Sequence, residues 1–332
     1  MIRMSSDSTA TYLLGAVGLC GEFPVSSLDQ LDGYYDYNRR RITELVREGY
    51  LRDWRFSYRR RTIHSLSLTK KGLDTLREYR PGCYDRIQSH LLAPANAKGD
   101  VSKALRLHRN AACLMMTLHF AKLALDCAPP AETDYPVYYA SYMLNKRMDA
   151  DSKGSRASGV IAYYEQFFVL YYLGKSNMRW NPEVESSFYM RIEQLLPGYH
   201  CVGRIFIAED WSLAESLISH AQKKYTNLIR FDKWVPTYLV TNDIYGKALF
   251  RAIVDVDFRF DLSGKYRNLI TSRQFDINGP LFQLEHWERL RTDDPPYSID
   301  EAFCFDFQKP TVDQINLCDM PIQVLPGSLL TE

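Results

Sequence analysis

The spacing of apolar residues over the first eighty positions switches between the helical period and the strand period. Apolar side chains at helical spacing, from Tyr12 to Cys20, predict an amphipathic helix near the start. Gly33 and Gly49 are suited to the ends of the helices that precede them. The expected order is helix 8–20, a short helix capped by Ser26 or Ser27 that presents Leu28 and Leu31, helix 34–48, strands 50–56 and 62–68, and helix 69–79 capped by Thr69.

That order resembles the winged helix-turn-helix domains of MarR- and PadR-type regulators. The residues that carry the resemblance read I-x-x-L-x-x-x-G-Y-L over 42–51 and L-x-L-T-x-x-G over 66–72. The resemblance implies that helix 34–48 is a recognition helix and that the two strands form a wing. It assigns residues 1–80 to a winged helix-turn-helix DNA-binding domain.

A change of composition follows this segment. Pro81, Gly82 and the stretch LLAPANAKGD predict a linker over residues 81–99. Asp100 is a suitable N-cap for a long helix that we expect to run to about residue 128, before a Pro-Pro pair. The centre of this helix is apolar almost all round, which favours burial in a core or pairing with a partner chain.

Strand-like and helix-like patterns alternate over the rest of the chain. We expect strands at 137–143, 158–165, 167–174, 201–209 and 234–240, and helices beginning near Pro182 and covering 211–220 and 242–253. This alternation predicts a mixed α/β domain over residues 100–332. The fold class expected for the whole chain is therefore multi-domain, α+β or α/β.

Composition narrows the class of protein. The chain has 332 residues, of which 46% are hydrophobic and 24% are charged, as in ordinary globular proteins. No run is apolar enough to span a bilayer, and the N-terminal residues lack the pattern of a signal peptide. The seven cysteines include no C-x-x-C pair, which is typical of a reduced protein. We expect a cytoplasmic location.

Charge is distributed unevenly along the chain. Residues 34–71 hold eleven Arg or Lys and four Asp or Glu, a net charge of +7, although the whole chain has a net charge of only +1. Residues 255–332 hold seven Arg or Lys and fourteen Asp or Glu, a net charge of −7. A basic segment inside a nearly neutral chain favours a polyanionic partner for that segment.

Helical geometry divides the first of two Arg-Arg-Arg triplets. Each residue turns by about 100° on a helix, so Ile42 and Leu45 define an inward stripe, with Arg39 at its border. An outward arginine in a recognition helix can donate two hydrogen bonds to guanine O6 and N7. The residues predicted to face outward toward DNA are Tyr37, Arg40, Arg41 and Glu44, and Arg39 at the border is predicted to bind DNA with them.

The second triplet falls at the tip of the expected hairpin. Arginines on a wing contact the DNA backbone or a narrow minor groove and supply affinity that does not depend on sequence. The residues predicted for this role are Arg55 on the strand and Arg59, Arg60 and Arg61 at the turn. A solvated basic hairpin without a ligand is the alternative. RNA is a less favoured ligand, because no stacking aromatics occur at the offsets of a known RNA-binding module.

From Asp100 onward, the expected order of one helix, three strands, one helix and one strand resembles the core of restriction-endonuclease-like nucleases. Such a site needs an acid on the second strand and Glu-x-Lys on the third, to hold a divalent metal. Here the third strand reads FFVLYY, and Glu165 at the end of the second strand has no partner at the required place. We therefore expect a degenerate core without nuclease activity and without a bound metal or other cofactor.

Other candidate motifs are incomplete. Residues 174–176 read Gly-Lys-Ser after a strand, but the P-loop glycine is replaced by Val169. The acidic side chains that alternate over residues 255–261 fit a half-exposed strand better than a metal site. His108 and His119 lie eleven residues apart without a third ligand. Arg156 in a Gly/Ser-rich stretch fits a surface loop.

The whole layout resembles the replication-relaxation proteins of plasmids and integrative elements. The phrases that suggest this are SRASGVIAYYEQFFVLYYLGKSNMRW and NPEVESSFYMRIEQLL. The resemblance implies a role in replication, transfer or regulation of a mobile element. We expect a non-catalytic, sequence-specific double-stranded DNA-binding protein, either a transcriptional regulator or an accessory factor, that acts as a homodimer away from membranes.

Two alternatives stay open. One is a metal-dependent nuclease whose active site is displaced to Glu165 or to the acidic face of residues 255–261. The other is a protein-interaction factor with a vestigial winged helix, which binds a partner through the acidic C-terminal part.

Overall fold

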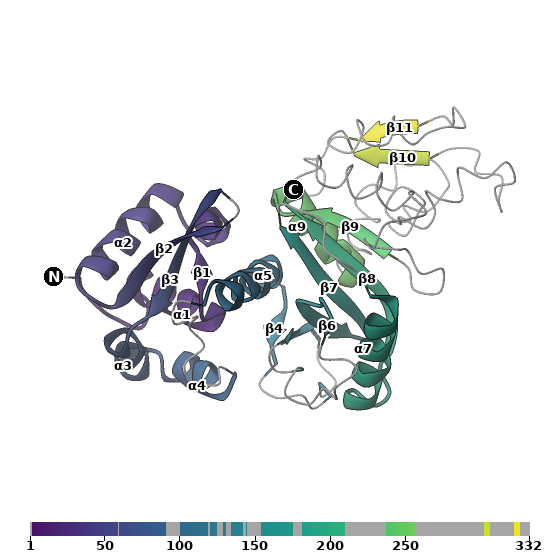
Figure 1. Ribbon diagram of the computed structural model, residues 1–332, viewed down its shortest axis with the longest axis horizontal. Helices are drawn as coiled ribbons and strands as arrows, with labels where there is room; N and C mark the ends of the chain where they lie inside the picture. Colours follow the sequence, from purple (N-terminus) through teal and green to yellow (C-terminus); the bar gives the residue numbers. More distant parts are fainter. Residues whose placement is uncertain are drawn as a thin grey trace, which may run out of the picture. The chain divides into compact units, whose positions relative to one another are not determined.

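The structure is a computed structural model of all 332 residues. It describes residues 2–58, 60–90, 100–118, 120–124, 129–130, 134–141, 144, 154–174, 181–209, 237–255, 302–305 and 322–325. The chain divides into two compact units. The first consists mainly of residues 1–118, and the second contains most of the remainder. Helices with a small antiparallel sheet form the first unit, and helices with a larger mixed sheet form the second (Figure 1).

The elements of the first unit follow the expected order closely. They are α1 (Thr9–Cys20), β1 (Phe23–Pro24), the 3₁₀ helix η1 (Val25–Gln30), α2 (Tyr35–Arg47), β2 (Leu51–Tyr58), β3 (Arg61–Leu68), α3 (Lys70–Tyr79), α4 (Pro81–His90) and α5 (Val101–Thr117). Strand β3 lies between β1 and β2, and both pairings are antiparallel. Ser8 caps α1 and Thr69 caps α3 through their side-chain oxygens.

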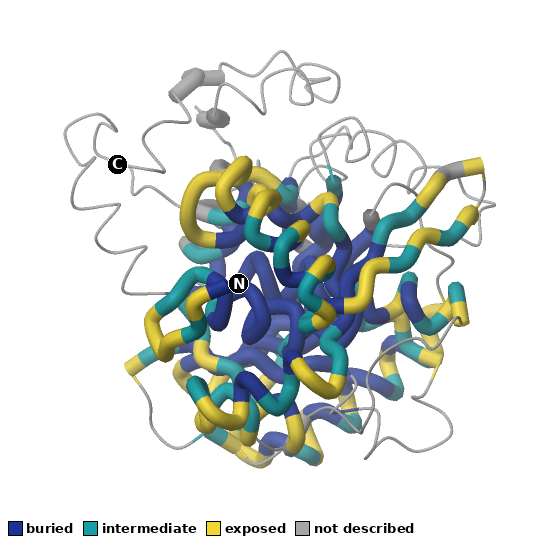
Figure 2. The backbone as a smooth tube through the Cα atoms, turned by 90° about the vertical axis from the view of Figure 1, so that its left-hand side faces the viewer, coloured by how far each residue is buried: buried dark blue, intermediate teal, exposed yellow. Residues whose placement is uncertain are grey.

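Helix α1 is the centre of this unit. Its apolar side chains are almost completely buried, and it contacts α2, α3, α4, α5 and β3. A side chain on Gly18 would approach within 2.6 Å of Ile87 of α4 and Leu68 of β3, so the glycine allows both elements to pack closely against α1. Buried residues follow the inner path of the chain, and exposed residues lie on its outer turns (Figure 2).

Three boundaries of the first unit differ from expectation. The short second helix is a 3₁₀ helix that begins at Val25 after Pro24, with no side-chain cap from Ser26 or Ser27. Residues 81–90, expected in a linker, form α4, because Pro81 occupies a first-turn position where its missing N–H costs no hydrogen bond. Asp100 caps α5 as expected, but the helix ends at Thr117 and belongs to the first unit.

The second sheet has six strands in sequential order. They are β4 (Lys122–Leu123), β5 (Val137–Ala140), β6 (Gly159–Tyr163), β7 (Gln166–Gly174), β8 (His200–Ala208) and β9 (Thr237–Thr241). Strands β6 and β7 form an antiparallel hairpin, whereas β7, β8 and β9 run parallel. Helix α7 (Pro182–Leu195) packs on β8 and α9 (Ile244–Val254) packs on β9. A parallel pair, β10 (Ala302–Phe305) and β11 (Ile322–Leu325), lies in the C-terminal part.

Strands β7 and β8 are buried on both faces, as a parallel sheet covered by helices requires. The expected strands at 137–143, 158–165, 167–174, 201–209 and 234–240 are confirmed within a few residues, while the helix expected at 211–220 lies outside the described residues. Cys20, Cys83, Cys113 and Cys201 are not joined in disulfide bonds. None of the described helices is long and apolar enough to cross a membrane.

The packing of Gly72 generates a stability prediction. A Cβ atom at this position would lie 2.3 Å from the carbonyl oxygen of Tyr50, so Gly72→Ala must push α3 away from the start of β2. We expect the free energy of unfolding to fall by about 1–3 kcal/mol, measured by urea denaturation. In the control Gly82→Ala, the added methyl group meets no atom within 4 Å. An equal effect of the two substitutions would contradict this packing.

Candidate nucleic-acid interface

Helix α2 is held to the first unit by one narrow stripe. Asn38, Ile42 and Leu45 are its buried residues. The Asn38 amide Nδ2 donates a 3.0 Å hydrogen bond to the carbonyl oxygen of Asp32, which ties the first turn of α2 to the turn before it. The other faces of the helix are accessible, and they carry its charged side chains.

Two arginines of α2 share one carboxylate. Arg41 donates a 2.7 Å hydrogen bond to Glu44, and Arg40 forms a 3.4 Å ion pair with the other oxygen of the same carboxylate. Arg41 also donates to the Tyr37 hydroxyl over 3.0 Å. The hydrogen bond from Arg41 lowers the pKa of the Glu44 carboxyl from its ordinary value. Glu44 therefore stays charged and offsets part of the positive charge of this face.

Exposure differs among the three arginines of the first triplet. The Arg40 side chain is 79% exposed, as expected for an outward residue, whereas that of Arg41 is 33% exposed because Tyr37 and Glu44 cover it. Arg39, expected at the border of the inward stripe, is exposed. Arg41 therefore lies on the same face as Tyr37 and Glu44, and these two side chains partly cover it. Arg39 and Arg40 are the more accessible cations.

The residues of the second triplet do not all lie in the hairpin turn. Strands β2 and β3 pair without interruption from Leu51↔Leu68 to Tyr58↔Arg61, so Arg61 belongs to a strand and not to the turn. Arg60 occupies the turn, exposed, with a φ of 63°. A non-glycine residue in this left-handed region costs about 1–2 kcal/mol. Arg59 lies outside the described residues. The basic turn thus retains an unfavourable backbone conformation that Gly or Asn would relieve.

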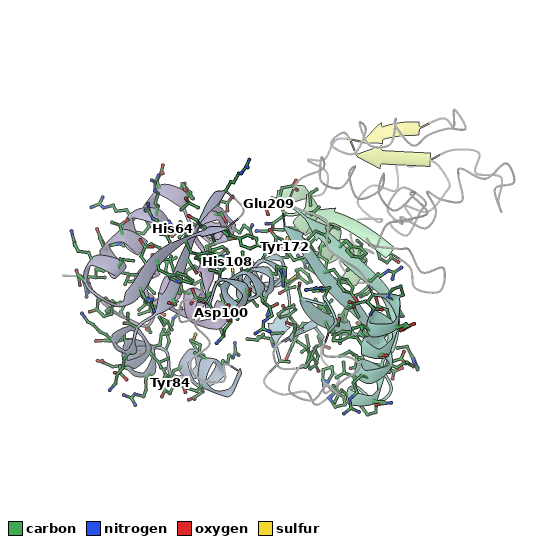
Figure 3. The ribbon with its side chains drawn as sticks, in the orientation of Figure 1. His64, Tyr84, Asp100, His108, Tyr172 and Glu209 are labelled. Carbon is green, nitrogen blue, oxygen red and sulfur yellow. The ribbon has the colours of Figure 1, made fainter. Side chains whose placement is uncertain are left out.

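The strand residue Arg55 has acid–base neighbours on its own face. Arg55 is exposed and pairs in register with His64 of β3. His64 in turn is hydrogen-bonded to Asp53, two residues before Arg55 (Figure 3). Alternation along β2 places Asp53 and Arg55 on the face opposite Trp54 and Phe56. One acid therefore lies beside the basic residue on this strand.

A buried carboxylate anchors the opposite face of the hairpin. Glu22 is 1% exposed, and one of its oxygens accepts hydrogen bonds from Trp54 Nε1 at 3.0 Å and from Ser65 Oγ at 2.6 Å. Trp54 and Ser65 are register partners on β2 and β3, so Glu22 joins both strands at one point. The Trp54 ring stacks on Phe56 at 4.4 Å between ring centroids.

Helix α5 reaches the same cluster through His108. Its Nε2 lies 2.9 Å from Ser65 Oγ, and because the single hydroxyl proton of Ser65 goes to Glu22, Nε2 must be the donor. Burial lowers the pKa of His108 to about 4, so the ring is neutral at pH 7. The histidine is therefore a structural residue that connects α5 to the hairpin, as its isolated position in the sequence suggested.

The second unit uses its polar side chains internally. Glu185 of α7, 2% exposed, accepts hydrogen bonds from Tyr171 at 2.7 Å, Ser155 at 2.7 Å and the backbone N–H of Arg156 at 2.8 Å. Burial raises the pKa of this carboxyl. The loop that contains Arg156 is thus held by a buried acid, and the Arg156 side chain is exposed.

A second polar cluster lies at the carboxyl ends of β7, β8 and β9. The Tyr172 hydroxyl donates to Glu209 and accepts a 3.3 Å hydrogen bond from Asn242 Nδ2 (Figure 3). Glu165 lies elsewhere, exposed in the two-residue β6–β7 turn with a φ of 57°. Within the described ranges, no three His, Cys, Asp or Glu residues gather as metal ligands. Apart from Asp255, the acidic stretch 255–261 lies outside those ranges.

Two features of the candidate interface are not predictable from the local sequence pattern. Tyr34 is 88% exposed at the N-cap of α2, and its only signal is the tyrosine-rich run YYDY. Glu22 gives no local signal, because its partners lie 32 and 43 residues further along the chain.

No protein-family model, no curated protein and no solved structure matches the chain. The function has to be inferred from the residues themselves.

The environment of His108 generates a pH prediction. Between pH 6.5 and 4 the unfolded chain binds a proton at this imidazole that the folded chain does not, so acidification favours unfolding. We expect His108 to contribute a loss of roughly 3 kcal/mol in the free energy of unfolding between pH 7 and pH 4. His108→Gln should remove this contribution in urea denaturation, whereas the control His64→Gln should retain it. Parallel pH profiles for wild type and His108→Gln would disprove the assignment.

Proposed function

We propose that the chain is a sequence-specific double-stranded DNA-binding protein whose first unit is a winged helix-turn-helix. In this proposal α2 is the recognition helix and the β2–β3 hairpin is the wing. The observation that carries the proposal is that one unit presents two separate basic elements: an α2 face with Arg39 and Arg40 exposed, and a hairpin that ends in Arg60 and Arg61. The order from α1 to α3 agrees with the order that the winged-helix resemblance implies.

The two basic elements suit different parts of a duplex. Arg40 projects from a helix whose narrow buried stripe leaves the opposite face accessible to a major groove. Arg60 is held at the end of two eight-residue strands, where its charge reaches phosphates regardless of sequence. Maintaining an arginine in a left-handed turn, where Gly or Asn would be more stable, favours a functional reason for the charge.

The role of the second unit is part of the same proposal. Glu185, the most deeply buried acid among the described residues of this unit, accepts hydrogen bonds from the Arg156 loop and from Tyr171, whose hydroxyl is also hydrogen-bonded to Tyr189; this structural use of the acid favours a non-catalytic domain. We infer a regulator or accessory factor of mobile DNA in the cytoplasm. We expect it to act as a homodimer, because a single winged helix reads only a short half-site.

Duplex binding and its salt dependence test the proposal. We expect the full chain to bind duplex DNA, with an affinity that falls steeply as salt rises because counterions are released from phosphates. Arg60→Asn keeps a residue that tolerates the left-handed turn. It should weaken binding to all duplexes alike and reduce the slope of log affinity against log salt concentration by about 1. Arg40→Ala should instead reduce discrimination at one base pair by about 1–3 kcal/mol.

Fluorescence anisotropy with selected and scrambled duplexes measures both effects. Failure of the wild-type chain to bind any duplex at low salt would refute the proposal and favour the protein-interaction alternative. Cleavage of plasmid DNA in Mg²⁺ that is lost on mutating Glu165 would favour the nuclease alternative.

Glu44 generates a second prediction. Its carboxylate holds Arg40 and Arg41 and would repel an approaching phosphate. Glu44→Gln should therefore raise the affinity for non-specific duplex by roughly three- to tenfold and steepen its salt dependence. The matched control Glu78→Gln makes the same change of charge on an exposed residue of α3. Equal gains for the two variants would show that net charge alone is responsible.

A further inference from the structure

Exposed aromatic rings concentrate on the proposed DNA-binding unit. Among the described residues, the large exposed apolar side chains are Tyr34, Tyr35, Tyr37, Tyr58, Tyr164 and Met190, and the first four belong to α2, its N-cap and the hairpin. Tyr34 is the most accessible of them, at 88%. Exposed rings gathered on one unit favour an interaction site on that unit.

Part of this group lies on α2 or directly before it. Tyr37 and Arg41, four residues apart, share one side of α2, and Tyr34 is the N-cap residue, with an extended backbone just before the first turn. The guanidinium of Arg41 already lies over the Tyr37 ring, 5.1 Å from the ring centroid. Tyr34 therefore lies at the N-terminal end of the helix that carries this pair.

The Tyr34 ring has no structural role within the described part of the chain. Its side chain makes no hydrogen bond and no ring contact there, and it does not cap α2. Both faces of the ring are accessible. Bases in a paired duplex cover their faces by stacking on each other and offer only their edges. An unpaired base, in contrast, offers a face that stacks on an aromatic ring regardless of its identity.

We propose that Tyr34 is a stacking platform for an unpaired base, so that the nucleic acid bound by the first unit is a duplex with an unpaired segment. This inference rests on the proposed DNA-binding function and names its substrate class. In this arrangement Arg40 contacts base edges and Arg60 contacts the backbone of the paired part. Tyr34 receives a base from the adjoining unpaired part.

Two DNA probes test the inference on the full-length chain at low salt: a mixed-sequence duplex, and the same duplex with a short unpaired loop. The wild-type chain should bind the looped probe more tightly. Tyr34→Ala should lose about tenfold in affinity for the looped probe and less than about twofold for the paired probe. Tyr34→Phe retains the ring and should bind both probes as the wild type does.

Controls separate this inference from the function on which it rests. Tyr164→Asn removes an exposed tyrosine of the second unit and should affect neither probe. Equal wild-type affinity for the two probes, or an equal loss on both in Tyr34→Ala, would overturn the stacking role while leaving duplex binding intact. A change of oligomeric state in Tyr34→Ala, measured by light scattering, would overturn it in favour of a protein contact. Absence of binding to both probes would refute the proposed function itself.

Discussion

One buried carboxylate determines how the basic hairpin is held. Glu22 lies just before β1 and accepts hydrogen bonds from Trp54 on β2 and Ser65 on β3, and Ser65 in turn accepts one from His108 on α5. A buried charge is tolerated only when such donors surround it. The cluster therefore ties the middle of a long two-stranded hairpin to α5 and to the residue before β1, and the tip of the hairpin carries Arg60.

Acidic side chains offset part of the positive charge of the basic elements. On α2, Glu44 binds two of the three arginines, and on the sheet His64 and Asp53 lie beside Arg55. Intramolecular acids of this kind weaken non-specific attraction to phosphate while leaving the arginines oriented, and discrimination between partners benefits from such competition. In the proposed function, α2 supplies discrimination and the hairpin supplies affinity. The two Arg-Arg-Arg runs are thus chemically alike but differ in their structural settings.

Features that depend on neighbouring residues were predictable from the sequence. The helical spacing around Ile42 and Leu45, the cap at Thr69 and the strand patterns on either side of Arg59 all express local periodicity, and the structure places α2, α3, β2 and β3 accordingly. Errors arose where local signals are ambiguous. Pro81 is typical of a break but begins α4, and an apolar run past Thr117 does not distinguish a helix from a strand. The shielding of Arg41 and the role of Glu22 depend on tertiary contacts, which periodicity does not reveal.

Hydrogen–deuterium exchange of the full chain with and without duplex DNA tests the central claim most directly, because it locates the bound surface residue by residue. The proposal predicts slower exchange in peptides covering the N-terminal turns of α2 and the end of the β2–β3 hairpin, with α3 and α7 unchanged. Protection confined to the second unit, or no protection under conditions where DNA is bound, would contradict it.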